Sequence, residues 1–134
     1  MVVVVVVDTS FLMIPAEFGI DIFAESERTL QKHVEFVVLK SVLREIETKA
    51  KLDSTSGDAK FRVAGDLAKR CRTADVSPDV AGLPVDDQLL EYTVGVKGVL
   101  ATNDRRLRER ARERGVPVLL MRGKKRLALE GIMD

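Results

Sequence analysis

The sequence has very few of the residues that build disulfides, soft-metal sites and aromatic platforms. Its 134 residues include one Cys, one His, one Tyr and five Phe, and no Trp. A single cysteine excludes an internal disulfide and any zinc site made from several thiolates. So few aromatic rings also argue against the base-stacking surface that many single-strand binders use. Any metal site in this chain is therefore expected to depend on oxygen ligands.

The chain also lacks a hydrophobic run long enough to cross a bilayer. Six valines occupy residues 2–7, whereas a spanning helix needs about 20 apolar residues. The run has neither the basic start nor the small-residue cleavage site of a signal peptide. We expect a cytoplasmic protein with no membrane segment. A length of 134 residues with 46% hydrophobic content predicts a single domain, residues 1–134.

The valine run is typical of a β-strand that is buried on both faces, as in the middle of a parallel sheet. Asp8 follows this run directly. Ligands of open α/β sheets bind at the carboxyl ends of the strands. A buried carboxylate at that place also needs a partner that offsets its desolvation. Asp8 is therefore the first candidate site residue.

Helical and strand patterns alternate along the rest of the chain. Apolar stretches at residues 36–39, 98–102 and 116–121 predict strands, residues 73–84 predict a short strand plus a loop, and residues 122–131 can add an edge strand. The alternation predicts a three-layer α/β/α fold with a central, mainly parallel sheet of four to five strands. The expected helices cover residues 14–31 in one or two pieces, 40–51, 60–71, 86–96 and 103–115.

Acidic residues stand at several of the predicted strand ends and helix starts. They are Asp8 after the first strand, Glu45 within a helix, Asp86 and Asp87 at one helix start, and Asp104 at another. Each acid at a helix start also has a structural explanation, because it can cap backbone N–H groups and gain about 0.3–1 kcal/mol from the macrodipole. Glu45 can equally be a solvated surface residue. From the residues alone, these alternatives stay open.

Convergence of these acids at one sheet edge would require a cation, because clustered carboxylates do not all stay ionised without one. Oxygen ligands favour Mg²⁺ or Mn²⁺, and the scarcity of His and Cys disfavours zinc, copper and iron. A carboxylate-bound divalent ion that keeps water ligands is suited to activate water and to neutralise a phosphate oxygen. Convergence would thus indicate phosphodiester hydrolysis.

Four short motifs occur in an order that resembles the PIN-domain nucleases. They are DTS after the first strand, VLREIE in a helix, DDQLL at a later helix start and LATNDRRLRER after a strand, and they span nearly the whole chain. The resemblance implies a PIN-like fold and a divalent-metal-dependent endoribonuclease, with RNA as its substrate and Mg²⁺ or Mn²⁺ as its cofactor. It also implies self-association as a homodimer or a higher homo-oligomer.

The resemblance assigns roles to individual residues of this chain. The residues that match the family's metal-binding and catalytic acids are Asp8, Glu45, Asp87 and Asp104. Asp86 serves either in place of Asp87 or as an added outer metal ligand. The hydroxyl residues that support the metal or its water are Thr9, Ser10 and Thr102.

Within the family, the chain most resembles the ribosomal-RNA-processing endonuclease of the small-subunit processome and its single-domain archaeal relatives. Toxin nucleases of the VapC type usually carry a phenylalanine soon after the last acid, where this chain has Leu107. A VapC-type toxin with an antitoxin partner is therefore the second interpretation, and it is not favoured. A non-catalytic RNA-binding or assembly module, in which the acids are structural, is the third.

Basic residues gather in one segment although the net charge is only +1. Residues 103–126 hold ten basic and three acidic residues, against twelve and eighteen in the remainder. Ion pairs at helical spacing, worth about 0.2–0.5 kcal/mol each, can make this segment an ordinary solvated face. Arginine forks that stay unpaired suit phosphate oxygens instead. The residues that we expect to bind RNA are Arg105, Arg106, Arg108, Arg112, Lys124 and Lys125.

Overall fold

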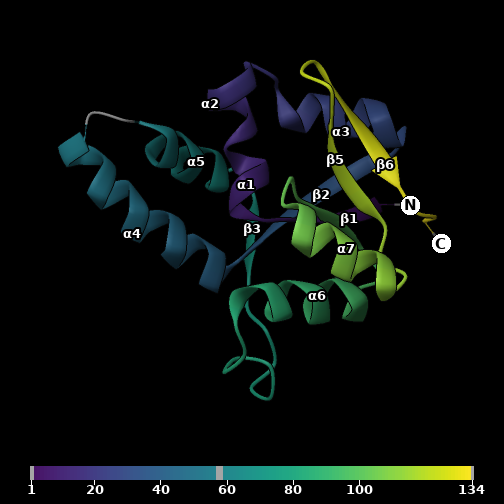
Figure 1. Cartoon of the computed structure of the whole chain (residues 1–134). Helices are drawn as coiled ribbons and strands as arrows, with labels where there is room; N and C mark the ends of the chain where they lie inside the picture. The colour runs from purple at the N-terminus through teal and green to yellow at the C-terminus, as the bar shows by residue number, and fades with distance from the viewer. Residues whose placement is uncertain (1, 57–58, 134) are drawn as a thin grey trace.

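A six-stranded sheet runs through the centre of the molecule, for which a computed structural model describes residues 2–56 and 59–133 (Figure 1). Its strands are β1 (Val2–Val7), β2 (His33–Leu39), β3 (Arg72–Ala74), β4 (Val99–Ala101), β5 (Val118–Arg122) and β6 (Arg126–Glu130). They lie in the order β3-β2-β1-β4-β5-β6. Neighbours from β3 to β5 pair in parallel, and β6 runs antiparallel to β5.

This architecture confirms the predicted three-layer α/β/α fold with a mainly parallel sheet. The expected number of four to five strands is too low, because residues that the sequence offered only as an optional edge strand do form β6. After a turn in which Gly123 has a φ of 71°, β6 returns along β5 from Arg122↔Arg126 to Val118↔Glu130. A hairpin therefore closes one side of the sheet.

The described residues form seven helices. The prediction of one or two helical pieces at residues 14–31 is confirmed, because Gly19 ends one helix with a left-handed φ of 68° and a second follows. None of the helices in the described ranges is long and apolar enough to span a membrane. The helices are α1 (Thr9–Leu12), α2 (Ile14–Phe18), α3 (Ile22–Leu30), α4 (Lys40–Ser56), α5 (Lys60–Ala68), α6 (Val85–Gly95) and α7 (Arg105–Glu113).

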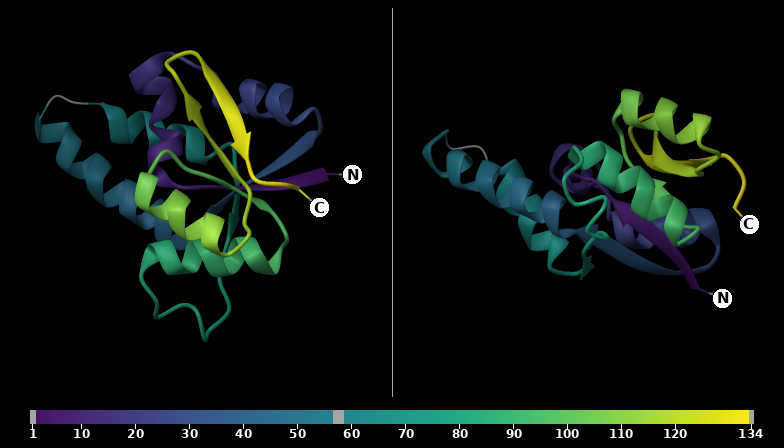
Figure 2. Two further views of the ribbon diagram at one scale, coloured as in Figure 1. Left: turned by 45° about the vertical axis from the view of Figure 1, so that its right-hand side comes forward. Right: turned by 90° about the horizontal axis from the view of Figure 1, so that it is seen from below.

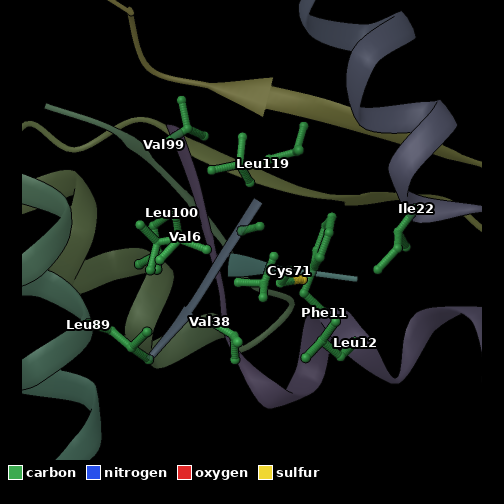
Figure 3. Packing of buried hydrophobic residues seen from close by; sticks show 14 of the residues in the cluster. Val6, Phe11, Leu12, Ile22, Val38, Cys71, Leu89, Val99, Leu100 and Leu119 are labelled. Carbon is green, nitrogen blue, oxygen red and sulfur yellow. The ribbon is translucent and has the colours of Figure 1, made fainter. Parts of the chain in front are cut away.

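The helices cover both faces of the sheet. Right-handed crossovers between parallel strands place α1 to α5 on one face and α6 and α7 on the other. In the core, Leu89 of α6 lies beside Val6 and Leu100, whereas Phe11 and Leu12 of α1 lie on the opposite side (Figure 3). All five of these side chains are at most 1% exposed. Helices α4 and α5 extend together away from the sheet as a pair (Figures 1 and 2).

The valine run of β1 is buried only toward its carboxyl end. Val5, Val6 and Val7 have no exposed surface, whereas Val2 is 61% exposed. The cause is the pairing, because β4 contacts β1 only from Val5 to Val7 and the start of β1 projects past it (Figure 2). The expectation that the whole run is buried on both faces is therefore wrong for its first half. The best-buried end of β1 is the end that leads to Asp8.

Gly98 lies where the chain enters β4 and passes close to β1. A Cβ atom at Gly98 would lie 2.8 Å from the carbonyl oxygen of Val4 and 3.3 Å from Cγ2 of Val96. The carbonyl oxygen belongs to the backbone of a central strand, so it cannot move aside without shifting β1. The close approach of these two backbones therefore requires glycine.

We predict that Gly98→Ala lowers the free energy of unfolding by about 1–3 kcal/mol, because the added methyl group pushes β4 away from β1. Urea denaturation of the purified protein measures this change. Gly95→Ala is the matched control: in the described part of the chain, apart from its sequence neighbours and the backbone of its own helix, no atom lies within 4 Å of its Cβ position. Alanine there favours α6 by up to about 1 kcal/mol. A Gly98→Ala protein as stable as the control would contradict the close approach.

Candidate active site

The candidate site lies at the sheet edge formed by the carboxyl ends of β1 and β4. Asp8 follows β1 and Thr102 follows β4, and the Asp8 N–H donates to the Ala101 carbonyl at 3.1 Å. Asp104 precedes α7, and Asp86 lies in the first turn of α6. Parallel pairing brings these segments, far apart in sequence, to one edge.

Asp8 is buried and accepts three hydrogen bonds. The residue as a whole is 7% exposed to solvent. Oδ1 accepts from the Ser10 hydroxyl at 2.7 Å and from the Phe11 N–H at 2.8 Å, and Oδ2 accepts from the Thr102 hydroxyl. The bond from Phe11 makes Asp8 the N-cap of α1. These donors provide part of the compensation that a buried carboxylate needs.

These hydrogen bonds do not fully offset the cost of burying the charged Asp8 carboxylate. Burial raises the pKa of Asp8 from its ordinary 3.8 to about 6, although the hydrogen bonds from Thr102, Phe11 and Ser10 lower it. The negative charge of Asp104 raises this pKa further. A cation bound beside Asp8 would favour the charged carboxylate and remove this penalty.

The hydroxyl groups that the sequence pointed to link the segments of the site. Thr102 Oγ1 donates to Asp8 and accepts from the Asp104 N–H at 3.0 Å, so it joins the end of β1 to the start of α7. Ser10 Oγ lies 3.3 Å from Thr102 Oγ1. Thr9 Oγ1 donates to Glu45 Oε1 at 2.7 Å and ties α1 to α4. Each of the three hydroxyls thus contacts a candidate acid.

Four of the candidate acids surround one pocket of about 240 Å³. They come from four separate segments and are Asp8, Glu45, Asp86 and Asp104. Apolar side chains form much of the remaining wall. The other lining residues are Thr9, Ser10, Met13, Val42, Lys49, Phe61, Val85 and Leu89.

Asp86 and Asp87 are adjacent in sequence but lie in different environments. Asp86 lines the pocket, whereas Asp87 forms an ion pair with Arg110 of α7 and is not part of the pocket lining. Burial raises the pKa of Asp86, and the negative charges of Asp104 and Glu45 raise it further while Arg110 lowers it. The structure therefore brings Asp86, rather than Asp87, together with the other acids.

Helix capping accounts for some of the acids but not for all. The Asp104 carboxylate accepts from the Leu107 N–H at 2.9 Å and caps α7. At the start of α6 the N-cap is Pro84, without a side-chain cap hydrogen bond. Asp104 thus serves as a cap and lines the pocket, whereas Asp86 makes no capping bond among the described residues that would explain its position.

The donor chemistry of the pocket fits a hard divalent cation. In the described ranges, no three His, Cys, Asp or Glu side chains form a group that could hold a metal ion. Mg²⁺ does not need three such side chains, because it is usually held by one or two carboxylates and keeps several waters. Asp8 and Asp86 are the acids whose pKa values burial raises, so they gain most from a nearby cation.

Helix α7 presents one row of arginines toward α6. Arg110 pairs with Asp87, and Arg114 Nη1 lies 2.7 Å from Glu91 Oε2. Arg106 occupies the next position of this row toward the sheet edge, one turn before Arg110. Arg106 is exposed and has no ion-pair partner among the described residues, which leaves its guanidinium available at the surface.

The second row of α7 faces a recess of about 320 Å³ that is lined by Arg105, Arg108, Glu109, Arg112 and Glu130. Arg105 Nε lies 3.3 Å from Glu109 Oε1, and Arg108 Nε lies 3.7 Å from Glu130 Oε1. Arg112 forms no ion pair within the described ranges. Lys124 and Lys125 are exposed in the turn between β5 and β6. The six expected RNA-binding residues are therefore spread over two faces of α7 and one turn.

The sequence reasoning missed Lys49, Phe61 and Arg110. Lys49 follows Glu45 by one helical turn, and this spacing could have placed it beside the acids. Phe61 comes from α5, and no local pattern predicts that α5 packs along α4 at this point. The pair between Arg110 and Asp87 depends in the same way on the packing of two helices.

Known proteins resemble this chain over most of its length. A family model described as a PIN like domain matches residues 5–124. Ribonuclease VapC4 of Methanocaldococcus jannaschii is 31% identical over 132 residues, which cover 96% of this chain and 98% of that protein. The structure of the PIN domain endonuclease Utp24 matches with a TM-score of 0.78 and 24% identity, over 98% of this chain and 93% of that one. PAE2754 from Pyrobaculum aerophilum matches with a TM-score of 0.54 and 19% identity, over 78% and 77% of the two chains.

We predict that Asp8→Asn stabilises the protein at pH 7.5, without divalent cations, by on the order of 1–3 kcal/mol. Because the folded pKa of about 6 lies above the ordinary 3.8, Asp8 contributes stability below about pH 3.8 that is lost as the pH rises through about 6. The advantage of the neutral amide, whose NH2 group would donate to the Thr102 hydroxyl where the carboxylate accepts from it, should therefore shrink as the pH falls toward 4.

Urea unfolding between pH 4.5 and 7.5 in the presence of a chelator measures this difference. Asp66→Asn is the control, because Asp66 is an exposed residue whose carboxylate lies 3.6 Å from Lys69 Nζ at the surface. We expect the control to differ little from the wild type across this range. A stability gain for Asp8→Asn that does not change with pH would contradict the raised pKa.

Proposed function

The chain belongs to the PIN-like domain family, and we propose that this PIN nuclease is an endoribonuclease that hydrolyses RNA with Mg²⁺ or Mn²⁺ held in the acidic pocket. The observation that carries the proposal is the convergence of Asp8, Glu45, Asp86 and Asp104 on one pocket. The relative named a ribonuclease supports RNA as the substrate. The fold shared with a PIN domain endonuclease is consistent with internal cleavage.

The four pocket acids are the residues that we assign to the metal, and Asp86 takes the place for which the family motif favoured Asp87. A divalent ion bound there supplies a Lewis acid that activates water and neutralises a phosphate oxygen. The protein contributes orientation. Thr102 and Ser10 hold the Asp8 carboxylate, and Thr9 holds Glu45. Acids that are held before the substrate arrives need little reorganisation during the reaction.

The basic side chains of α7 and of the β5–β6 turn provide the contacts to the RNA backbone in this proposal. Arg106 and Arg112 have no ion-pair partner among the described residues, which supports their assignment to phosphate. Arg105 and Arg108 can exchange their surface pairs for phosphate contacts, because such pairs are worth only about 0–1 kcal/mol. Contacts of this kind set affinity and salt dependence rather than sequence preference.

A VapC-type toxin is the second candidate, and the 31% identity to Ribonuclease VapC4 favours it. Both candidates use the same pocket, so the difference lies in the cell rather than in the chemistry. Growth arrest on expression, relieved by a co-expressed antitoxin, would distinguish the toxin from a processing enzyme. A role in ribosomal RNA processing and self-association into a homodimer or larger homo-oligomer stay predictions of the resemblance.

We predict that Asp8→Asn and Asp86→Asn each lower Mn²⁺-dependent RNA cleavage by about 100-fold. Asp87→Asn should stay within about threefold of the wild type, because its carboxylate pairs with Arg110 outside the pocket. Initial rates on an end-labelled structured RNA, with and without a chelator, measure these effects. Calorimetric titration with Mn²⁺ should show weaker binding for the first two variants and unchanged binding for Asp87→Asn.

The adjacent pair Asp86 and Asp87 makes this test internally controlled, since both substitutions remove one charge from the first turn of α6. Loss of cleavage in Asp87→Asn alone would return the metal site to the residue that the motif favoured. RNA binding by the wild type that does not change with Mn²⁺ and is never followed by cleavage would favour the non-catalytic module.

A further inference from the structure

Lys49 is the basic side chain in the lining of the acidic pocket, and within the described residues it is the only one there. It follows Glu45 by one turn of α4, so both side chains are on the same side of the helix. Phe61, near the start of α5, faces it, and Lys49 Nζ lies 5.4 Å from the centre of the Phe61 ring. The paired helices α4 and α5 that carry these residues stand beside α1, which follows Asp8 (Figure 1).

The aromatic ring holds the Lys49 ammonium without cancelling its charge. A cation within about 6 Å of a ring centroid is attracted to the face of the ring. An acidic partner would instead neutralise it, and Lys49 forms no ion pair within the described ranges, although Glu45 is at favourable helical spacing. The full positive charge of Lys49 is therefore available to an anion at the pocket.

The negative charge of the pocket favours a cationic group beside it. Its lining carries four carboxyl groups, and an incoming phosphodiester adds another negative charge. A divalent ion held by the acids would offset part of this negative charge, and Lys49 is the basic group that the described lining adds beside it. An ammonium cannot coordinate a metal ion, because it has three donors and no acceptor. Lys49 is suited to the phosphate instead.

We propose that Lys49, held against Phe61, binds a phosphate group of the RNA strand as the strand enters the acidic pocket. This inference rests on the proposed function. It adds a substrate contact on the α4–α5 side, opposite to the arginines of α7. The strand would then cross the pocket between two cationic sides, with the carboxylates between them.

Steady-state cleavage of a short single-stranded RNA with Mn²⁺ tests the proposal in Lys49→Gln and Lys49→Arg. We expect Lys49→Gln to lower kcat/KM about tenfold, the size of effect usual for one lost charged hydrogen bond. The plot of log kcat/KM against log[KCl] should become less steep by about 0.7, as for one lost phosphate contact on a single strand. Lys49→Arg should keep kcat/KM within about threefold, and the Mn²⁺ midpoint should not change in either variant.

Lys32→Gln is the matched control. Lys32 lines a different groove, of about 480 Å³, together with the start of β1 at the other end of the sheet. The control loses the same charge and should keep the wild-type rate and salt dependence. Equal behaviour of Lys49→Gln and Lys32→Gln would overturn the proposal. So would a lower Mn²⁺ midpoint with an unchanged salt slope, because Lys49 would then balance the acids instead of binding phosphate.

The wild type in the same assay distinguishes a failure of the role proposed for Lys49 from a failure of the proposed nuclease function. Cleavage by the wild type with no effect of Lys49→Gln overturns the role of Lys49 and leaves the nuclease intact. Absence of cleavage by the wild type overturns the proposed function and the role of Lys49 with it.

Discussion

The buried carboxylate of Asp8 determines how the parts of the site fit together. The valines before it are packed away from water, and the first polar side chain after them is held in the same low-dielectric surroundings. Its hydrogen bonds are therefore obligatory. The Phe11 N–H that meets one oxygen fixes the start of α1, and the Thr102 hydroxyl that meets the other fixes the end of β4. Because Thr102 also accepts from the Asp104 N–H, the start of α7 is fixed in turn.

The packing of α6 against α7 gives the two adjacent acids Asp86 and Asp87 different environments. Both helices begin at the same sheet edge, and the pairs Arg110 with Asp87 and Arg114 with Glu91 join them at successive turns. Each pair is partly exposed and contributes little stability alone. Its effect is on geometry, because it turns Asp87 toward α7 and leaves Asp86 on the side of the pocket. Two adjacent acids thus acquire different environments from one helix contact.

Sequence reasoning succeeded where a pattern is local. The alternation of apolar strands and amphipathic helices was sufficient to predict the parallel sheet. The positions of Asp8 and Asp104 after strands were sufficient to predict that they lie at one edge of it. It failed where the answer depends on how elements pack. Adjacent helix positions point about 100° apart, so the choice between Asp86 and Asp87 depends on the position of α7. Phe61 reaches the pocket only because α5 lies along α4, and Val2 is exposed only because β4 starts late.

The bond between Thr102 and Asp8 joins residues 94 positions apart, and this separation has a consequence for the timing of synthesis. During synthesis the amino end of the chain leaves the ribosome first. Strand β1 and helix α4 with Glu45 therefore emerge long before β4 and Asp104. Until residue 102 has emerged, Asp8 lacks the hydroxyl that meets Oδ2, and β1 lacks β4 beside it. The pocket therefore assembles late, after most of the domain has been made. A nascent chain in which residues 102–104 have not yet emerged therefore lacks the Thr102 contacts that join Asp8 to Asp104.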